Sequence, residues 1–367
     1  MGFKCGIVGL PNVGKSTLFN ALTKSSMAQA ANYPFCTIEP NVGKVGVPDN
    51  RLTMLAKVAG SAKIIPTQLE IVDIAGLVKG ASTGEGLGNK FLSHIREVDA
   101  ILHIVRCFDD DDIAHVEKTI DPVRDIELIE TELVLADLES MTKRVDSFTK
   151  KNKHNHDKNT ENELALMTKC LNILQQGSPA RMMLSQGFSE AEIRPLQLIT
   201  AKPYIYICNV GENDIASGNH YSQSVADFAA KNKINTILIS SKIEAEIVTL
   251  EDEAEQASFL AELGMAETGL SKVIRSGYEL LNLTTFFTIG PKEAHAWTTP
   301  RNTLAPQAAG VIHTDFEKGF IRAEIIGYED YVKYNGEGGA KENGRMRLEG
   351  KEYQVVDGDI VHFRFNV

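Results

Sequence analysis

One run of residues constrains the fold of this chain more than any other feature: Gly9-Leu10-Pro11-Asn12-Val13-Gly14-Lys15-Ser16-Thr17, which fits the pattern G-x-x-x-x-G-K-[ST]. A strand-like run, Cys5–Val8, precedes it, and helix-like sequence follows from Thr17. Here glycines let backbone N–H groups surround phosphate oxygens, and the positive helix end adds to the attraction. We predict a phosphate-binding loop in which Lys15 reaches the β- and γ-phosphates and Ser16 binds Mg²⁺. The alternative is a glycine-rich turn with an incidental lysine.

Short apolar runs rich in β-branched residues recur along the chain, and helix-like sequence follows each one. Such runs are typical of strands buried on both faces of a parallel sheet, and alternation with helices predicts a doubly wound α/β domain. Ligands of such folds bind beyond the carboxyl ends of the strands. The runs are Cys5–Val8, Leu69–Val72, Ile101–Val105, Tyr204–Cys208 and Thr236–Ile239.

Composition excludes several classes of protein. The chain has 367 residues with 43% hydrophobic and 24% charged residues, which excludes fibrous and wholly disordered proteins. No apolar stretch is long enough to span a bilayer, so we expect no membrane contact. The net charge of −11 argues against DNA binding, and any RNA contact needs a local basic patch. Five scattered cysteines without C-x-x-C spacing predict reduced thiols, a cytoplasmic location and no zinc site.

The sequence pattern changes twice along the chain. Residues 121–200 carry apolar residues at alternating four- and three-residue spacing in two arms, which predicts an antiparallel helical hairpin with a charged tip. From about Leu283 the apolar and polar residues alternate as in half-buried strands. We therefore predict a nucleotide domain made of residues 1–120 and 201–280, a hairpin insertion at 121–200, and a separate mixed β domain at 283–367.

A second motif, Asp73-Ile74-Ala75-Gly76, follows the run Leu69–Val72. An Asp at a strand end of a P-loop protein holds Mg²⁺, usually through water, and the Gly76 N–H is placed to meet the γ-phosphate. Thr37 is the predicted second Mg²⁺ ligand; the alternative for it is a turn threonine.

Three further residues bear on hydrolysis. Leu77 stands where Ras-like enzymes place a water-orienting glutamine, so hydrolysis needs another group, needs a partner, or is slow. His115 is a candidate because it is titratable and follows the run Ile101–Val105; a surface histidine at a helix start is the alternative. Asn12 has an oxygen that could bind a monovalent cation such as K⁺ beside the phosphates, or could simply cap the loop.

The base-reading segment departs from the usual guanine motif N-K-x-D. The chain has Asn209-Val210-Gly211-Glu212, in which the lysine is lost and the carboxylate is displaced by one methylene. A hydrogen-bonding site discriminates strongly only when its polar groups are well placed, so the preference for guanine should be lost. We predict that adenine is bound by Asn209 and backbone groups near Val210, with backbone N–H groups of Ser240 and Ser241 completing the pocket.

Together these motifs resemble the YchF family of Obg-like ATPases, within the Obg-related P-loop NTPases. The resemblance covers essentially the whole chain and rests on the runs G-L-P-N-V-G-K-S, Y-P-F-C-T-I-E-P-N, D-I-A-G-L-V-K-G-A-S-T-G-E-G-L-G-N-K-F-L, N-V-G-E and F-E-K-G-F-I-R-A-E. It implies an Obg-type nucleotide domain, an antiparallel coiled coil, and a C-terminal TGS domain of β-grasp fold. It also implies hydrolysis of ATP in preference to GTP and association with ribosomes. We further expect a monomer, and the large subunit as the part of the ribosome that it contacts.

The resemblance also assigns residues. It places phosphates on Asn12, Val13, Gly14, Lys15, Ser16 and Thr17, Mg²⁺ on Ser16 and Thr37, and the base on Asn209 and Val210. An Obg-type GTPase switch and an adaptor whose nucleotide only gates binding remain the alternatives. The predicted ribosome contact is the hairpin tip, the TGS domain or both. The tip is basic, through Lys143, Arg144, Lys150, Lys151, Lys153 and Lys158; a solvated turn is the alternative.

Overall fold

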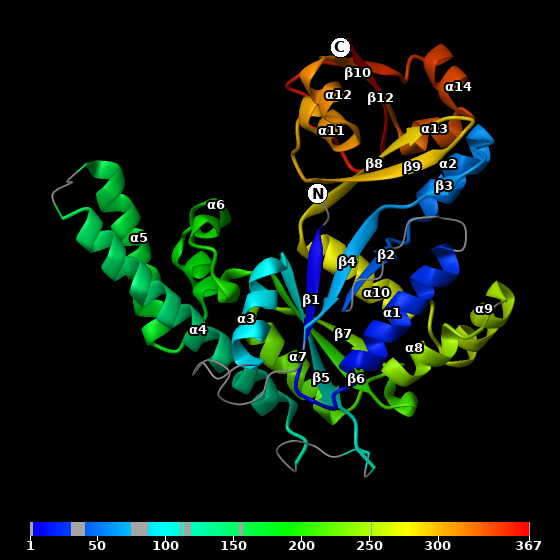
Figure 1. The fold of residues 1–367 in the computed structure, drawn as a ribbon. Coiled ribbons are helices and arrows are strands. Elements are labelled where there is room, and N and C mark those ends of the chain that lie inside the picture. Colours follow the sequence, from blue (N-terminus) through cyan, green and yellow to red (C-terminus); the bar gives the residue numbers. More distant parts are fainter. Residues whose placement is uncertain are drawn as a thin grey trace.

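The computed structural model describes residues 3–30, 41–74, 87–110, 112–113, 119–153, 157–250 and 252–366. A six-stranded sheet forms the centre of the molecule (Figure 1), and all of its neighbouring strands run parallel except β2, which is antiparallel to β4. The predicted α/β fold is confirmed. In sheet order the strands are β2 (Val42–Gly46), β4 (Gln68–Asp73), β1 (Lys4–Val8), β5 (Ala100–Cys107), β6 (Tyr204–Val210) and β7 (Asn235–Ile239).

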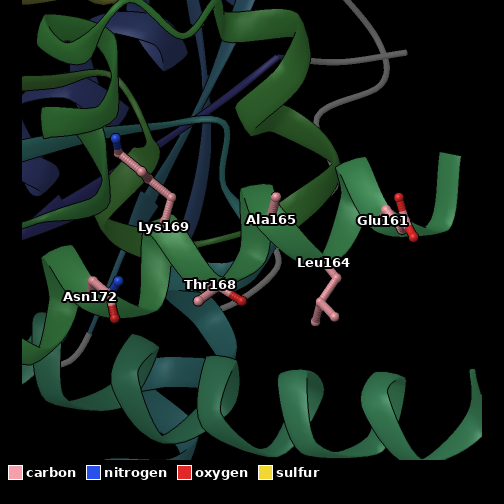
Figure 2. A pocket seen from close by; sticks show the side chains of 6 residues that line it. All are labelled: Glu161, Leu164, Ala165, Thr168, Lys169 and Asn172. Atoms are coloured by element: carbon pink, nitrogen blue, oxygen red, sulfur yellow. The ribbon is translucent and has the colours of Figure 1, made fainter. Parts of the chain in front are cut away.

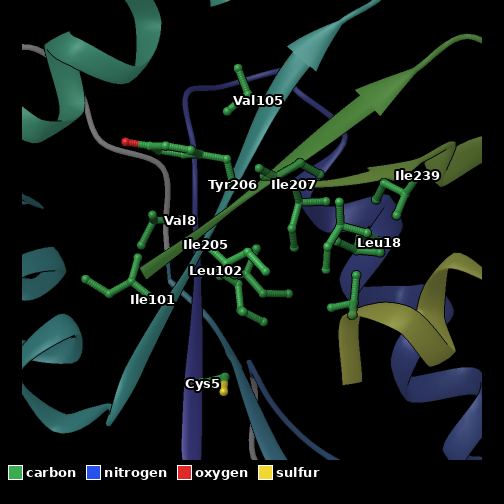
Figure 3. Close-up of a cluster of buried hydrophobic side chains, with 14 of the residues drawn as sticks. Cys5, Val8, Leu18, Ile101, Leu102, Val105, Ile205, Tyr206, Ile207 and Ile239 are labelled. Atoms are coloured by element: carbon green, nitrogen blue, oxygen red, sulfur yellow. The ribbon is translucent and has the colours of Figure 1, made fainter. Parts of the chain in front are cut away.

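Helices cover both faces of this sheet, with α1 and α10 on one face and α3 and α7 on the other (Figure 1). Every residue of β5 and β6 is buried, as expected for central strands between two helix layers. Figure 3 shows the packed side chains, among them Leu18, Leu102 and Ile207. The helices around the sheet are α1 (Lys15–Ala30), α3 (Leu87–Glu97), α7 (His220–Asn232), α8 (Ser241–Ile247), α9 (Glu253–Glu262) and α10 (Gly269–Leu280), with the short η5 (Glu212–Asp214) after β6.

The predicted hairpin region forms two long antiparallel helices, α4 (Pro122–Lys151) and α5 (Lys158–Gln175), which project from the sheet (Figure 1). Asp121 and Asp157 cap them by accepting hydrogen bonds from backbone N–H groups of the first turns. Short helices then pack back on the pair and place Met183, Ile193 and Leu196 in its apolar core. These are η2 (Ala180–Gln186), α6 (Glu190–Ile193), η3 (Arg194–Leu196) and η4 (Ile199–Ala201).

A second six-stranded sheet lies at the C-terminal end, with helices packed on both of its faces. In sheet order its strands are β11 (Arg347–Glu349), β10 (Phe320–Gly327), β12 (Asp359–Phe365), β8 (Leu283–Ile289), β9 (Ala294–Pro300) and β3 (Ile64–Ile65). Its helices are α11 (Ala305–Ile312), α12 (Thr314–Lys318), α13 (Tyr328–Lys333), α14 (Glu337–Glu342) and, from the N-terminal part of the chain, α2 (Asn50–Ala59). Within the described ranges, no helix is both long and apolar enough to cross a membrane.

The packing of α2 and β3 differs from the predicted domain division. That division puts residues 1–120 in the nucleotide domain, whereas β3 pairs with β9 and the leucines Leu52 and Leu55 are buried with Phe287 and Ile326 of the C-terminal part. The periodic apolar face of α2 indicates that one side is buried, but periodicity carries no information about which surface covers it.

A buried polar cluster joins the base of the hairpin to the central sheet. The Tyr204 hydroxyl and His103 Nδ1 lie 2.6 Å apart, and the Tyr206 hydroxyl donates to Glu130 of α4 at 2.8 Å. Arg181 of η2 also donates to Glu130, at 2.5 Å. Burial lowers the pKa of His103 to about 3, because the charged imidazolium would lose its hydration.

This shift predicts that acid destabilises the protein through His103. Between pH 6.5 and 3 the unfolded chain binds a proton that the folded chain excludes, so the free energy of unfolding falls as pH falls. The loss is about 1.4 kcal/mol per pH unit, or about 2 kcal/mol from pH 6.5 to 5. Urea unfolding of a His103→Gln variant should show a pH slope that is shallower by this amount. Replacing the exposed His220 by Gln is the control, and parallel slopes for parent and His103→Gln would contradict the assignment.

Candidate nucleotide site

The predicted phosphate-binding loop runs from the end of β1 to the start of α1 at Lys15. Asn12 and Gly14 adopt left-handed backbone conformations with φ of 63° and 93°. A Cβ on Gly9 would lie 2.7 Å from the Ile104 carbonyl oxygen, and one on Gly14 would clash with the Asn209 amide. Close packing against β5 and β6 therefore requires both glycines of the motif, and the left-handed backbone also favours glycine at Gly14.

The structure brings two of the predicted site residues into direct contact. Lys15 Nζ forms an ion pair with Asp73, the last residue of β4, and both side chains are largely buried, with 11% and 13% exposed. The contact follows from topology: β1 and β4 are parallel neighbours, with Ile7 opposite Asp73, so both carboxyl ends meet at one edge. A cation and a carboxylate side by side can separate to bind, respectively, a phosphate and a hydrated metal ion.

The donor set at this edge fits Mg²⁺. Ser16 is exposed at the first turn of α1, next to Lys15 and its partner Asp73. In the part of the chain that the structure describes, no group of three or more His, Cys, Asp or Glu side chains could hold a metal ion. Mg²⁺ in phosphate sites is typically held by one or two protein oxygens together with phosphates and water, so a site of few protein ligands suits it.

Asn209 connects the phosphate loop to the predicted base pocket. Its side chain is buried; Nδ2 donates to the Val13 carbonyl at 2.9 Å, and Oδ1 accepts from the Ser241 N–H at 2.8 Å. The amide thus holds two loops together, while one further donor and one lone pair remain available. We predicted that the Ser241 N–H faces the base; instead, it donates to Asn209 Oδ1.

The other predicted base residues lie around this junction. Val210 is the buried last residue of β6, and the half-exposed Glu212 forms an ion pair with Lys242 in the first turn of α8. Ser240 and Ser241 are buried, and no hydrogen-bond partner for the Ser241 hydroxyl occurs among the described residues. Lys242 therefore competes for the carboxylate that would otherwise be available to a base.

Four predicted residues, Thr37, Gly76, Leu77 and His115, lie outside the described residues. Arg106, which the sequence analysis did not single out, is buried and donates to the carbonyls of Phe108, Asp110 and Ile113 at 3.1, 3.1 and 2.9 Å. It thereby fixes the chain that leaves β5. The signal for it was a charged residue directly after a largely apolar run, a position where a cation needs internal partners.

A surface pocket lies elsewhere, along one side of α5 (Figure 2). Its volume is about 440 Å³, and none of the predicted nucleotide residues lines it. The lining residues all come from the same helix and recur at helical spacing: Glu161, Leu164, Ala165, Thr168, Lys169 and Asn172. This pocket is therefore separate from the loop between β1 and α1 that the sequence predicts to bind phosphate.

Comparisons with known proteins match the N-terminal and the C-terminal parts of the chain to separate family models. The family model described as "50S ribosome-binding GTPase" matches residues 4–138, and the YchF GTPase C-terminal model, described as "Protein of unknown function (DUF933)", matches residues 283–366. The protein named "Ribosome-binding ATPase YchF" is 55% identical over 370 residues in Haemophilus influenzae and 51% identical over 369 residues in Bacillus subtilis, with 100% of each chain covered. The solved structure of a YchF GTPase from Schizosaccharomyces pombe superposes with a TM-score of 0.89 and 40% identity, covering 99% of this chain and 98% of that one.

Proposed function

The chain belongs to the YchF family, and on that premise we propose that it is a ribosome-binding ATPase that hydrolyses ATP to ADP and phosphate. The observation that carries the proposal is the contact of Lys15 with Asp73 beside the N-terminus of α1, in a chain that matches ribosome-binding ATPases over its full length. This contact supports the proposal, because a lysine and an aspartate at one edge of a parallel sheet are the residue types with which P-loop NTPases bind phosphate and hydrated Mg²⁺.

In the proposed mechanism, backbone N–H groups from Asn12 to Thr17 surround the phosphates, and Lys15 leaves Asp73 for the β- and γ-phosphates. Bound Mg²⁺ would neutralise charge that develops on the phosphates, and Ser16, Thr37 and Asp73 would hold it, Asp73 through water. The Gly76 N–H binds the γ-phosphate, and His115 orients the attacking water. An oxygen of Asn12 would hold K⁺ beside the phosphates. The contacts to the phosphates are needed most in the transition state, as the bond to the γ-phosphorus breaks and charge moves onto the β-phosphate of the departing ADP.

Selectivity for ATP is proposed to come from the segment after β6. Guanine needs a carboxylate placed to accept two hydrogen bonds, and here the carboxylate of Glu212 is displaced by one methylene and paired with Lys242. Adenine needs no such carboxylate and is bound by Asn209, backbone groups at Val210 and the adjoining Ser240, while the Ser241 N–H holds the Asn209 side chain in place.

ATP is therefore expected to bind at least several-fold more tightly than GTP when both are titrated side by side by calorimetry. Val210→Lys combined with Glu212→Asp restores the guanine-reading pattern and should recover part of the GTP affinity, because the shorter carboxylate regains its bidentate geometry. Equal affinities in the parent protein, or tighter GTP binding, would overturn the assignment to ATP. Measuring turnover with and without ribosomes separates an ATPase from an adaptor with incidental hydrolysis.

We propose that the two parts of the chain outside the nucleotide domain contact the ribosome. The α4–α5 hairpin acts as an antiparallel coiled coil, and residues 283–367 act as a TGS domain of β-grasp type. We propose contact with the large subunit through the hairpin tip, the TGS domain or both, by a cytoplasmic monomer. The description of the matched family model as ribosome-binding, with the 50S particle named, supports the choice of subunit.

A further inference from the structure

One β-hairpin has the nucleotide site at one end and the C-terminal sheet at the other. Strands β2 and β4 pair antiparallel from Val42 opposite Val72 to Gly46 opposite Gln68. At one end lies Asp73, whose carboxylate contacts Lys15 and whose N–H donates to the Asn41 carbonyl at 2.8 Å. At the other end, the chain between the two strands, residues 47–67, leaves the central sheet; we call it the docking segment.

The docking segment is built into the C-terminal sheet rather than lying on it. Strand β3 adds to β9, with Ile64 opposite Ala294. Hydrogen bonds cross in both directions: the Ala62 N–H donates to the Pro291 carbonyl at 3.0 Å, and the Ala294 N–H donates to the Lys63 carbonyl at 2.8 Å. Figure 1 shows the continuity, with β4 rising from the central sheet to α2 and β3 beside β8 and β9.

Side chains reinforce this joint. Leu55 is fully buried in a cluster with Phe287 and Ile326 of the C-terminal part. Arg51 donates to Asp49 in its own segment at 2.8 Å and to Asp357 in the C-terminal part at 2.5 Å, with its guanidinium 5.4 Å from the centre of the Phe287 ring. The docking segment is therefore continuous with β4 of the central sheet and is also packed into the C-terminal sheet. A shift of β4 must either break the contacts of the docking segment or move the whole C-terminal sheet.

We propose that the β2–β4 hairpin transmits the state of the nucleotide site to the C-terminal domain. The inference rests on the proposed function, because it requires ATP and Mg²⁺ to draw Lys15 away from Asp73. Asp73 thus pairs with Lys15 in one state and would face hydrated Mg²⁺ in the other. A displacement of Asp73 between the two states moves the rigid pair of strands β2 and β4, and the docking segment moves with them. Coupling between sites is reciprocal, so a ribosome that binds one position of the C-terminal domain would change ATP affinity by the same factor.

Hydrogen exchange of the full-length protein tests the inference. A non-hydrolysable ATP analogue with Mg²⁺, compared with ADP, should change exchange at the Ala62 and Ala294 amides by a factor of about five or more, the lower range of typical coupling. The single tryptophan, Trp297, lies on β9 with its ring stacked on His295 at 3.7 Å, and its emission should change with the same nucleotide dependence. Protection of the Gly14 and Lys15 amides reports binding itself.

Two arginine variants provide the comparison. Arg51→Ala should abolish the nucleotide effect at Ala294 while leaving protection of Gly14 unchanged. Arg364→Ala should leave both intact, because Arg364 pairs with Glu324 within the C-terminal sheet and does not contact the docking segment. Protection at Gly14 with no response at Ala62, Ala294 or Trp297 in the parent would overturn the inference, as would a full response in Arg51→Ala. No protection at Gly14 would instead contradict the proposed ATP site.

Discussion

Replacing Lys15 by alanine is expected to lower ATP turnover by roughly two to three orders of magnitude, the usual loss when one preorganised donor to a developing charge is removed. Lys15 begins α1 where the helix N-terminus and the loop amides converge, and its ammonium group is largely buried beside Asp73. A charge-assisted contact in such a site strengthens as the phosphates gain charge, so the loss should fall on kcat more than on ATP binding.

The comparison for this variant is Lys24→Ala, which removes an exposed lysine farther along the same helix. Lys15→Ala also leaves the Asp73 carboxylate without its cation, so circular dichroism and a melting curve must show that the fold persists. The expected result is a folded, inactive Lys15→Ala protein beside a fully active Lys24→Ala protein. If Lys15→Ala hydrolysed ATP at the parent rate, the assignment of the P-loop as the catalytic site would be wrong.

The parts of the fold that could be predicted are those specified by neighbouring residues. Short apolar runs such as Tyr204–Cys208 are recognisable because a central strand is buried on both faces. The loop before Lys15 is recognisable because phosphate binding requires glycines at fixed positions. Strand β2, Val42-Gly43-Lys44-Val45-Gly46, lacks such a signal: Gly43 is needed because a side chain there would collide with Thr23 of α1. That requirement comes from a distant element and leaves no local pattern.

The contacts made by the site residues could not be predicted for the same reason. The sequence identifies Asn209 as a polar residue after a strand, but its partners, Val13 and Ser241, come from two other loops. Likewise, the pairing of Glu212 with Lys242 depends on how β6 and β7 lie side by side. Residue type indicates what a side chain can bind, and only the assembled sheet edge determines which partner it meets.

The structure also reduces the set of basic hairpin residues that we expect to contact the ribosome. Lys143 pairs with Glu139 at 2.5 Å, and Arg144 donates to the Leu196 carbonyl at 3.1 Å, so both have partners within the hairpin region. The hairpin tip, as we now define it, consists of Lys150, Lys151, Lys153 and Lys158. All four are exposed, and no ion pair or hydrogen bond of their side chains occurs within the described ranges. On a chain of net charge −11, this tip projects away from the body (Figure 1).

Changing Lys150, Lys151 and Lys153 to Glu is therefore expected to weaken co-sedimentation with ribosomes by about tenfold or more at moderate salt and to flatten its salt dependence. Each lost phosphate contact removes about 0.7 to 0.9 from the slope of log affinity against log salt, because fewer counterions are released. Three lost contacts should lower the slope by about 2 to 3. ATP turnover without ribosomes should persist, since the P-loop belongs to the central sheet.

A triple variant with Lys24, Lys231 and Lys233 changed to Glu controls for net charge, because these exposed lysines lie on or directly after helices around the central sheet, away from the tip, and change the total by the same amount. If the ribosome contacts the tip itself, the control variant keeps the salt slope of the parent protein and the tip variant does not. If only net charge matters, both variants bind ribosomes more weakly by a similar amount. Parent-like pelleting of the tip variant at every salt concentration would make the tip a solvated turn. The contact would then have to come from the C-terminal domain, which also carries the joint to the nucleotide site.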